Sequence, residues 1–164
     1  MKNLKKQFNV FCIAILTVTM ISCNNDDDVA TMDTANTAGE FLTAKVDGVD
    51  FSAMEVSVTA TTSNNVLSLV GGDSNGNTFQ MAIQNYNGVG TYVTGDVITN
   101  SNAMSYITVT PFALWTSTFD TGNGTLEVTT DDGSIIEGTF EFLGYKDAST
   151  RILFSDGEFK ANIE

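Results

Sequence analysis

The stretch Gly124-Thr-Leu-Glu-Val-Thr-Thr-Asp-Asp-Gly-Ser-Ile-Ile-Glu-Gly-Thr-Phe-Glu-Phe-Leu143 decides the fold. Apolar and polar residues alternate on both sides of Asp-Asp-Gly, which is typical of two half-buried β-strands joined by a tight turn. The alternation predicts that one set of side chains faces a core and the other faces solvent. The predicted core residues are Leu126, Val128, Ile136, Phe140 and Phe142, and the predicted solvent-facing residues are Glu127, Thr139 and Glu141.

The turn also predicts which residues of the two strands lie opposite each other. A three-residue loop with a left-handed Gly133 sets Val128 opposite Ile136. It also sets Glu127 opposite Glu137, a like-charge pair that costs up to about 1 kcal/mol. A two-residue loop would instead oppose Val128 and Glu137, an apolar side chain against a charged one. We therefore expect the three-residue loop.

The same period of two extends over the chain from residue 40 onward. Predicted strands cover residues 41–46, 49–62, 66–71, 78–84, 104–110, 112–119 and the end of the chain. Asp47-Gly48 is a hairpin signal, and Pro111 marks an edge or a bend. The predicted fold is therefore all-β, an antiparallel β-sandwich or open barrel of about 8–10 strands built from hairpins, with little or no helix.

The last strand breaks its own alternation. Ile152 and Phe154 are even-numbered apolar positions, whereas Phe159, Ala161 and Ile163 are odd-numbered. One extra residue must be absorbed between the two sets. We expect a bulge or a short turn near residues 156–157.

A Gly-polar-aromatic triplet recurs four times, beginning at Gly39, Gly90, Gly138 and Gly157. Glycine leaves a gap on a strand, and an aromatic ring on a neighbouring strand can cover it. The triplets therefore predict aromatic rings packed over strand glycines.

The start of the chain has the features of an export signal. Lys2, Lys5 and Lys6 precede an apolar run of about 14 residues, shorter than the roughly 20 that a membrane-spanning helix needs. Ser22 and Cys23 follow this run, so residues 1–22 are expected to be a removable leader.

This segment resembles the bacterial lipoprotein signal, with Met20 in the position where that family most often has leucine. The resemblance implies cleavage between Ser22 and Cys23 and lipidation of Cys23. The alternative is a secretory leader cut nearby.

The residues after Cys23 bear on where the protein goes. In the lipoprotein family an aspartate directly after the cysteine retains the protein at the inner membrane, and here that residue is Asn24. The resemblance thus implies transfer to the outer membrane. The run Asp26, Asp27 and Asp28 resembles the acidic signal that sends lipoproteins to the cell surface; the alternative is a solvated charge run.

Residues 23–39 lack aromatic residues and a hydrophobic period, so we expect the lipidated cysteine to be followed by a flexible acidic tether. Within it, Asp33-Thr34-Ala35 resembles an O-glycosylation acceptor of bacteria with surface lipoproteins, with Thr34 as the modified residue. Residues 40–164 are expected to form a single all-β domain.

The composition excludes several classes of function. Three of the seven Lys and Arg residues and none of the twenty Asp and Glu residues lie in the leader, so residues 23–164 keep four cations against twenty acids, a formal charge of −16. Nucleic acid and anionic lipid are disfavoured because both need a basic surface. The chain has no histidine, and no thiol remains after Cys12 and Cys23. Catalytic nucleophiles that depend on histidine or cysteine, and ordinary zinc sites, are therefore not expected.

Two weaker candidates for ligand contact remain. Residues 73–77 and 120–123 are oxygen-rich loops. We expect them to be turns, and binding of a structural calcium ion is the alternative. Trp115 is the only tryptophan, and its apolar surroundings favour a place in the core. If it is exposed instead, Trp115 together with Tyr106 could stack a sugar or contact a protein.

The triplets, the opening Phe41-x-x-Ala44-Lys45-Val46-Asp47-Gly48 and the closing Gly157-Glu158-Phe159 resemble an uncharacterised family of short β-rich domains in bacterial lipoproteins. The resemblance covers most of residues 40–164. Its motifs are turn and packing residues, so it implies the fold and lends no activity.

The expected function is that of an outer-membrane, surface-exposed lipoprotein with a non-catalytic domain that binds a protein or a glycan. A structural envelope component without a specific ligand is the first alternative. A carboxylate-dependent glycan hydrolase that uses Glu127 and Glu137 is the second. Both glutamates fall on the polar face of their strands, which favours a non-enzymatic reading.

Overall fold

A computed structural model describes residues 39–164 of the chain. The predicted leader, the processing site at Ser22 and Cys23, the aspartates 26–28 and Thr34 lie outside the described residues. Residues 37–164 form one compact unit, and all the buried hydrophobic residues of the described chain belong to its single core. A unit with its own hydrophobic core has the anatomy of a domain.

The described residues form eleven strands and one short 3-10 turn. The strands are β1 (Phe41–Val46), β2 (Val49–Ser52), β3 (Thr59–Ser63), β4 (Val66–Gly72), β5 (Thr78–Gln84), β6 (Gly90–Thr94), β7 (Ala103–Val109), β8 (Phe112–Thr118), β9 (Asn123–Asp131), β10 (Ile135–Tyr145) and β11 (Arg151–Asn162). Between residues 39 and 164, no helix is long and apolar enough to cross a membrane.

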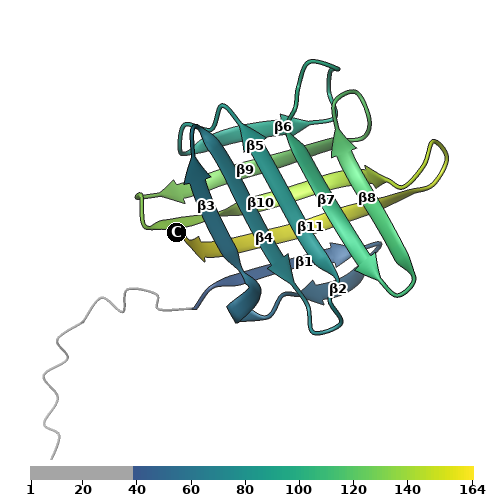
Figure 1. The fold of residues 1–164 in the computed structure, drawn as a ribbon, viewed down its shortest axis with the longest axis horizontal. Helices are drawn as coiled ribbons and strands as arrows, with labels where there is room; N and C mark the ends of the chain where they lie inside the picture. Colours follow the sequence, from purple (N-terminus) through teal and green to yellow (C-terminus); the bar gives the residue numbers. More distant parts are fainter. Residues whose placement is uncertain (1–38) are drawn as a thin grey trace, which may run out of the picture. The chain divides into compact units, whose positions relative to one another are not determined.

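The strands form one antiparallel sheet that curls into a half-barrel, so the all-β prediction is confirmed. In Figure 1, β3, β4, β5, β7 and β8 form the front layer, and β6, β9, β10, β11, β1 and β2 cross behind them. Strand β10 joins the layers because its first part pairs with β9 and its end pairs with β8, where Tyr145 lies opposite Thr116. The open barrel is the nearer of the two predicted arrangements.

The predicted strand over residues 49–62 is wrong, because the chain turns a corner between the layers there. β2 ends at Ser52, the 3-10 turn Glu55–Ser57 follows, and β3 begins in the other layer. The Ser57 hydroxyl bonds the carbonyl oxygens of Met54 and Gly72, each at 2.7 Å. This corner gives eleven strands in the described part, where about 8–10 were expected.

Phe79 of β5 is the centre of the core. Its ring is fully buried and contacts rings from both layers. The partners are Phe51, Tyr106, Phe140, Phe142 and Phe154, with ring centroids 4.7 to 6.2 Å away. Aromatic packing therefore connects the two layers at the centre of the core.

In the β9–β10 hairpin, the inward and outward faces are as predicted and the register is not. Leu126, Val128, Ile136, Phe140 and Phe142 are all buried, whereas Glu127, Thr139 and Glu141 are exposed. Val128, however, lies opposite Gly138 rather than Ile136, and Glu127 lies opposite Thr139 rather than Glu137.

Two local features cause the change of register. Asp132 begins the turn because its carboxylate accepts hydrogen bonds from the backbone N–H groups of Ser134 and Ile135, both at 2.8 Å. A bulge then places Thr129 as an extra residue in β9, between the partners of Glu137 and Gly138. The shift preserves the faces and changes the partners.

The predicted bulge in the last strand is confirmed. Phe140 lies opposite Gly157 and Phe142 opposite Phe154, so Ser155 and Asp156 together oppose a single residue of β10. Asp156 has a φ of 50°, the left-handed conformation that such a bulge uses.

Two of the triplets pair with each other across β10 and β11. Gly138 lies opposite Phe159, and Phe140 lies opposite Gly157. A Cβ atom at Gly138 would lie 2.9 Å from the Phe159 ring, and one at Gly157 would lie 2.7 Å from the Phe140 ring. Each aromatic ring thus covers the glycine of the other triplet, as the sequence predicted.

Candidate functional site

The middle residues of three triplets meet on the outer face of the back layer. Thr91 lies opposite Glu127, which lies opposite Thr139. Thr139 in turn lies opposite Glu158, and Glu158 opposite Thr43. We call these five residues the threonine–glutamate row. It crosses five adjacent strands, from β6 through β9, β10 and β11 to β1.

The glutamates of this row are exposed and lack cationic partners. Within the described part of the chain, no ion pair or hydrogen bond engages the carboxylates of Glu127, Glu158 and neighbouring Glu141. Adjacent strands lie about 4.8 Å apart, so the backbones of Glu127 and Glu158 are separated by about 10 Å. The row therefore presents unpaired negative charge flanked by hydroxyl groups.

Three adjoining hollows extend along this face, and we call them together the outer groove. The middle hollow, of about 320 Å³, lies over the threonine–glutamate row. It shares Thr125 and Glu141 with a hollow of about 510 Å³ near β6, and shares Asp156 with one of about 310 Å³ over β1 and β2. A long ligand could therefore contact several strands at once.

The apolar lining of the groove is concentrated at one end. Val93, Leu143 and Leu153 line the largest hollow, together with Asp96. Val93 and Leu153 are exposed. The groove thus combines an acidic middle with an apolar end.

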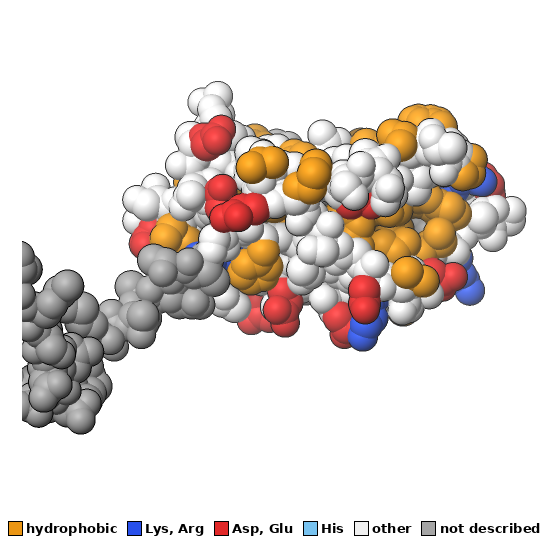
Figure 2. Space-filling model, turned by 90° about the horizontal axis from the view of Figure 1, so that it is seen from below, with side chains coloured by type: hydrophobic (Ala, Val, Ile, Leu, Met, Phe, Trp, Pro, Cys, Tyr) orange, Lys and Arg blue, Asp and Glu red, His pale blue; other side chains and the backbone are white. Residues whose placement is uncertain are grey.

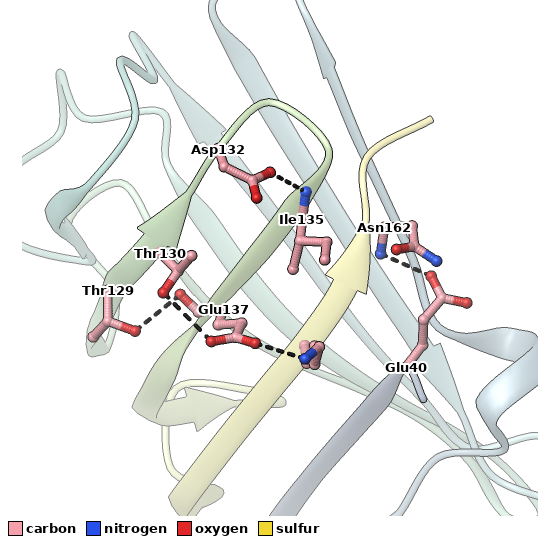
Figure 3. Close-up of polar contacts among 8 residues, drawn as sticks. Glu40, Thr129, Thr130, Asp132, Ile135, Glu137 and Asn162 are labelled. Atoms are coloured by element: carbon pink, nitrogen blue, oxygen red, sulfur yellow. Dashed lines mark hydrogen bonds and ion pairs between the residues drawn. The ribbon is translucent and has the colours of Figure 1, made fainter. Parts of the chain in front are cut away.

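Two nearby acidic residues are paired with lysines. Lys45 lies 3.0 Å from Asp156, and Lys160 lies 2.9 Å from Glu137. The Asp156 carboxylate, through its hydrogen bond and its charge, raises the pKa of Lys45. The Thr130 hydroxyl donates to the other oxygen of the Glu137 carboxylate at 3.4 Å, and Figure 3 shows these two side chains.

The prediction that the candidate catalytic residues Glu127 and Glu137 lie opposite each other is wrong. Thr130 lies opposite Glu137, and Thr139 lies opposite Glu127, because of the bulge at Thr129. Glu137 is also neutralised by its lysine partner. The carboxylates that the structure aligns on the outer face are instead Glu127 and Glu158.

The two candidate ligand-contact aromatics are core residues. Trp115 is 8% exposed and Tyr106 is 5% exposed. They lie opposite each other on the inner face of β7 and β8, and the Tyr106 ring contacts Phe79 and Phe154. Burial raises the pKa of Tyr106. Neither ring offers a free face for a sugar.

The oxygen-rich loops use their polar groups internally. The Asp73 carboxylate accepts hydrogen bonds from the backbone N–H groups of Asn75 and Asn77, each at 2.8 Å. Burial favours a higher pKa for Asp73, but these bonds and those from the two side-chain amides outweigh it and hold the pKa below its ordinary value. In the second loop, Thr118 and Thr121 exchange backbone hydrogen bonds at 2.9 Å. Among residues 39–164, no group of three acidic, histidine or cysteine side chains is placed to hold a metal ion.

Comparison with known families gives the family of the chain and no chemistry for the groove. The family model described as Domain of unknown function (DUF6252) matches residues 22–161. The chain belongs to this family. Searches of curated proteins and of solved structures each found no match. The DUF6252 match covers all but the last three residues of the β unit, so the half-barrel and its outer groove are the structure of this family's domain in the present chain.

Sequence reasoning identified the triplets of this DUF6252 domain but not the row that they form. The signal that could have found the row is the middle residue of three of the four triplets. Because glycine and ring point inward, the residue between them points outward. Thr91, Thr139 and Glu158 are those residues.

Proposed function

We propose that this chain is a lipid-anchored protein of the cell surface whose β domain binds a partner protein without catalysis. The outer groove is the binding surface. The observation that carries this proposal is the threonine–glutamate row, where exposed, unpaired carboxylates line a hollow that continues across neighbouring strands.

The anchor is proposed from the sequence. Ser22 and Cys23 follow a basic start and an apolar run in the order of a lipoprotein signal. The family match begins at residue 22, next to the proposed acylated cysteine, which supports this reading. Two or more acyl chains would hold the protein firmly in a membrane, whereas a single chain binds only marginally.

The groove favours a partner segment that carries Lys or Arg side chains. Glu127, Glu141 and Glu158 offer acceptors to cations, and the threonines between them offer hydroxyl groups. Val93 and Leu153 give the same segment an apolar contact. A glycan ligand is less well supported because the aromatic rings near the groove are buried and present no stacking face.

A hydrolytic function has less support from this geometry. A carboxyl group that acts as a general acid near neutral pH needs an apolar environment. Glu127 and Glu158 face water on the outside of the sheet. We therefore assign them to binding.

Capture of partners from extracts of the native cell surface tests the proposal. Immobilised residues 37–164 should retain a basic protein at low salt and release it near 1 M salt, where the screening length falls to about 3 Å. The double variant Glu127→Gln/Glu158→Gln should lose the retained protein. The variant Glu55→Gln/Glu164→Gln removes the same charge outside the groove and should keep it.

Two results would contradict the proposal. Equal retention by both double variants would exclude the groove as the binding surface. Turnover of a polysaccharide or peptide that is lost with Glu127→Gln or Glu158→Gln would show an enzyme.

A further inference from the structure

Three Asn-Gly pairs occur in the chain, and all three lie in the described domain. They are Asn75-Gly76, Asn87-Gly88 and Asn123-Gly124. An asparagine before glycine loses its side-chain amide readily, because glycine has no Cβ to hinder attack by its own backbone nitrogen on the asparagine Cγ. The reaction needs a free glycine N–H and room to close a five-membered ring. The fold places the three pairs in different environments.

The pair Asn123-Gly124 is held inside the sheet. Gly124 lies in β9, opposite Phe142 of β10 on one side and opposite Thr94 of β6 on the other. A Cβ atom at Gly124 would lie 2.6 Å from the Thr94 Oγ1 atom and 2.7 Å from the Phe142 Cβ atom. Strand pairing on both sides and the lack of space therefore oppose ring closure at this pair.

The pair Asn75-Gly76 is held by hydrogen bonds in its turn. The Gly76 N–H, which would be the attacking group, donates to the Asp73 carbonyl oxygen at 3.1 Å. The Asp73 carboxylate accepts hydrogen bonds from the Asn75 backbone N–H at 2.8 Å and from the Asn75 side-chain amide at 3.4 Å. Both the attacking nitrogen and the leaving amide are therefore engaged.

The pair Asn87-Gly88 lacks these restraints. Asn87 is exposed and lies between β5 and β6. Within residues 39–164, no hydrogen bond engages the Gly88 N–H or the nitrogen of the Asn87 side chain. The Tyr92 hydroxyl donates to Asn87 Oδ1 at 3.1 Å, but this oxygen stays on Cγ when the nitrogen leaves. A Cβ atom at Gly88 would come within 4 Å of one atom, Asp131 Oδ2 at 3.8 Å, so the ring has room.

We propose that Asn87 is a site of spontaneous deamidation in the folded protein and reacts before Asn75 and Asn123. The Gly88 nitrogen bonds to Asn87 Cγ and gives up its proton, the bond from Cγ to the side-chain nitrogen breaks, and ammonia leaves. Water then opens the cyclic imide. Attack of water on Cγ gives aspartate. Attack on the main-chain carbonyl carbon of residue 87 gives isoaspartate, whose backbone runs through the former side chain.

Either product places a new carboxylate in a hollow at the end of the domain. Asn87, Gly88 and Asp131 help to line this hollow of about 480 Å³, and no Lys or Arg of the described chain lines it. The Asp131 carboxylate already accepts a hydrogen bond from the Tyr86 hydroxyl at 2.6 Å. Figure 2 shows Asp and Glu side chains spread along one face of the domain. Deamidation therefore adds charge to a surface that is already acidic.

The isoaspartate product also changes how the β5–β6 connection is held. The Tyr92 hydroxyl accepts a hydrogen bond from the Asn87 N–H at 3.2 Å and donates to the Gly88 carbonyl oxygen at 2.7 Å. Isoaspartate inserts a methylene group into the backbone between these two partners. The hydroxyl therefore cannot keep both contacts in their present geometry.

Peptide mapping of the full chain tests the proposal. The folded protein, purified in detergent, is incubated at mildly alkaline pH, and samples taken over time are digested briefly with chymotrypsin. Cleavage after Tyr86 and Tyr92 isolates residues 87–92. Mass spectrometry then measures aspartate and isoaspartate at each Asn-Gly pair, with the starting sample as the blank. Asn87 should be converted several-fold faster than Asn75 and Asn123, with isoaspartate among its products.

Two controls separate the effect of the fold from that of the Asn-Gly sequence. In denaturant the three pairs should react at similar rates, because each glycine N–H is then free. Asp73→Ala removes the carboxylate that holds Asn75 and should raise conversion at Asn75 toward that at Asn87, with no change at Asn123. Circular dichroism confirms that this variant is folded.

Three results would overturn the proposal. The first is an Asn87 that stays intact in the folded protein while it reacts in denaturant. The second is conversion of Asn75 or Asn123 at the rate of Asn87 under native conditions. The third is conversion of Asn87 to aspartate without isoaspartate, which would indicate direct hydrolysis of the amide instead of attack by the Gly88 nitrogen.

Discussion

Gly138 lies directly opposite Phe159 in the β10–β11 pair, and the Phe159 ring occupies the space where a side chain of residue 138 would begin. The reciprocal pair, Gly157 and Phe140, lies two residues further along β10. The two pairs enclose Thr139 and Glu158 between them on the opposite face. Packing inside the half-barrel therefore sets the alignment of the threonine–glutamate row outside it.

The first prediction tests this packing. Gly138→Ala should destabilise the fold by about 1–3 kcal/mol, because the added methyl group overlaps the Glu127 carbonyl oxygen and the Phe159 ring. Gly90→Ala is the matched control, since a Cβ there meets nothing closer than 3.9 Å. Chemical denaturation measures both. Equal stability of the two variants would contradict the proposed role of the Gly138 gap.

Much of the fold could be predicted from the sequence because successive side chains of a half-buried strand face the core and the solvent in turn. Apolar and polar residues therefore alternate along the strand. The alternation in residues 124–143 gave the correct inner and outer faces, and the parity break gave the bulge at Asp156. Both inferences depend only on which side chains are apolar. They remain valid when strand partners change, provided that the shift keeps the faces.

The partners themselves could not be predicted, because backbone details decide them. Thr129 has no feature that marks it as a bulge, and its insertion moved Glu127 away from Glu137. The predicted facing pair Glu127 and Glu137 was wrong for the same reason. Glu127 and Glu158 come from strands that are not neighbours in sequence, and only the pairing of β10 with both strands brings them into one row.

A second prediction concerns the β10–β11 loop at low pH. Hydrogen bonds from Ser149 and Thr150 lower the pKa of Asp147 from 3.8 to about 2. Because the folded pKa is depressed, the carboxylate stabilises this loop at pH values above about 4, and the contribution is lost as the pH falls through about 2. An NMR titration of Asp147 should show this midpoint. Asp147→Asn should flatten the acid dependence of the Ser149 amide signal, and an ordinary midpoint in the wild type would contradict the geometry.

The third prediction concerns the anchor. Cys23→Ala should leave an unprocessed chain that takes up no labelled fatty acid, because the cysteine thiol is the proposed acceptor. Metabolic labelling followed by gel analysis measures this. The leader cysteine, Cys12→Ala, is the control and should be labelled normally. Label retained in the Cys23 variant would exclude this residue as the lipidated one.

The fourth prediction concerns display on the cell surface. Replacing Asp26, Asp27 and Asp28 with alanine should keep the protein on the inner leaflet, because the acidic run is the proposed export signal. Protease treatment of intact cells should then spare the variant and degrade the wild type. Alanine at Asn24 and Asn25 controls for a change near the lipid. If the triple variant is as accessible as the wild type, the run is a solvated charge cluster.

The fifth prediction concerns Thr139, where a lysine should neutralise the acidic middle of the groove. Thr139 lies opposite both Glu127 and Glu158 on one face, so Thr139→Lys places an ammonium group between the two carboxylates. Each cross-strand pair of opposite charge contributes about 0.2–1 kcal/mol, so the variant should be as stable as the wild type or slightly more stable. The same ion pairs should remove the attraction for a basic partner and abolish its capture at low salt. Thr61→Lys, on the exposed face of β3, adds the same charge outside the groove and should bind normally. Undiminished capture by a stable Thr139→Lys protein would show that the partner binds elsewhere.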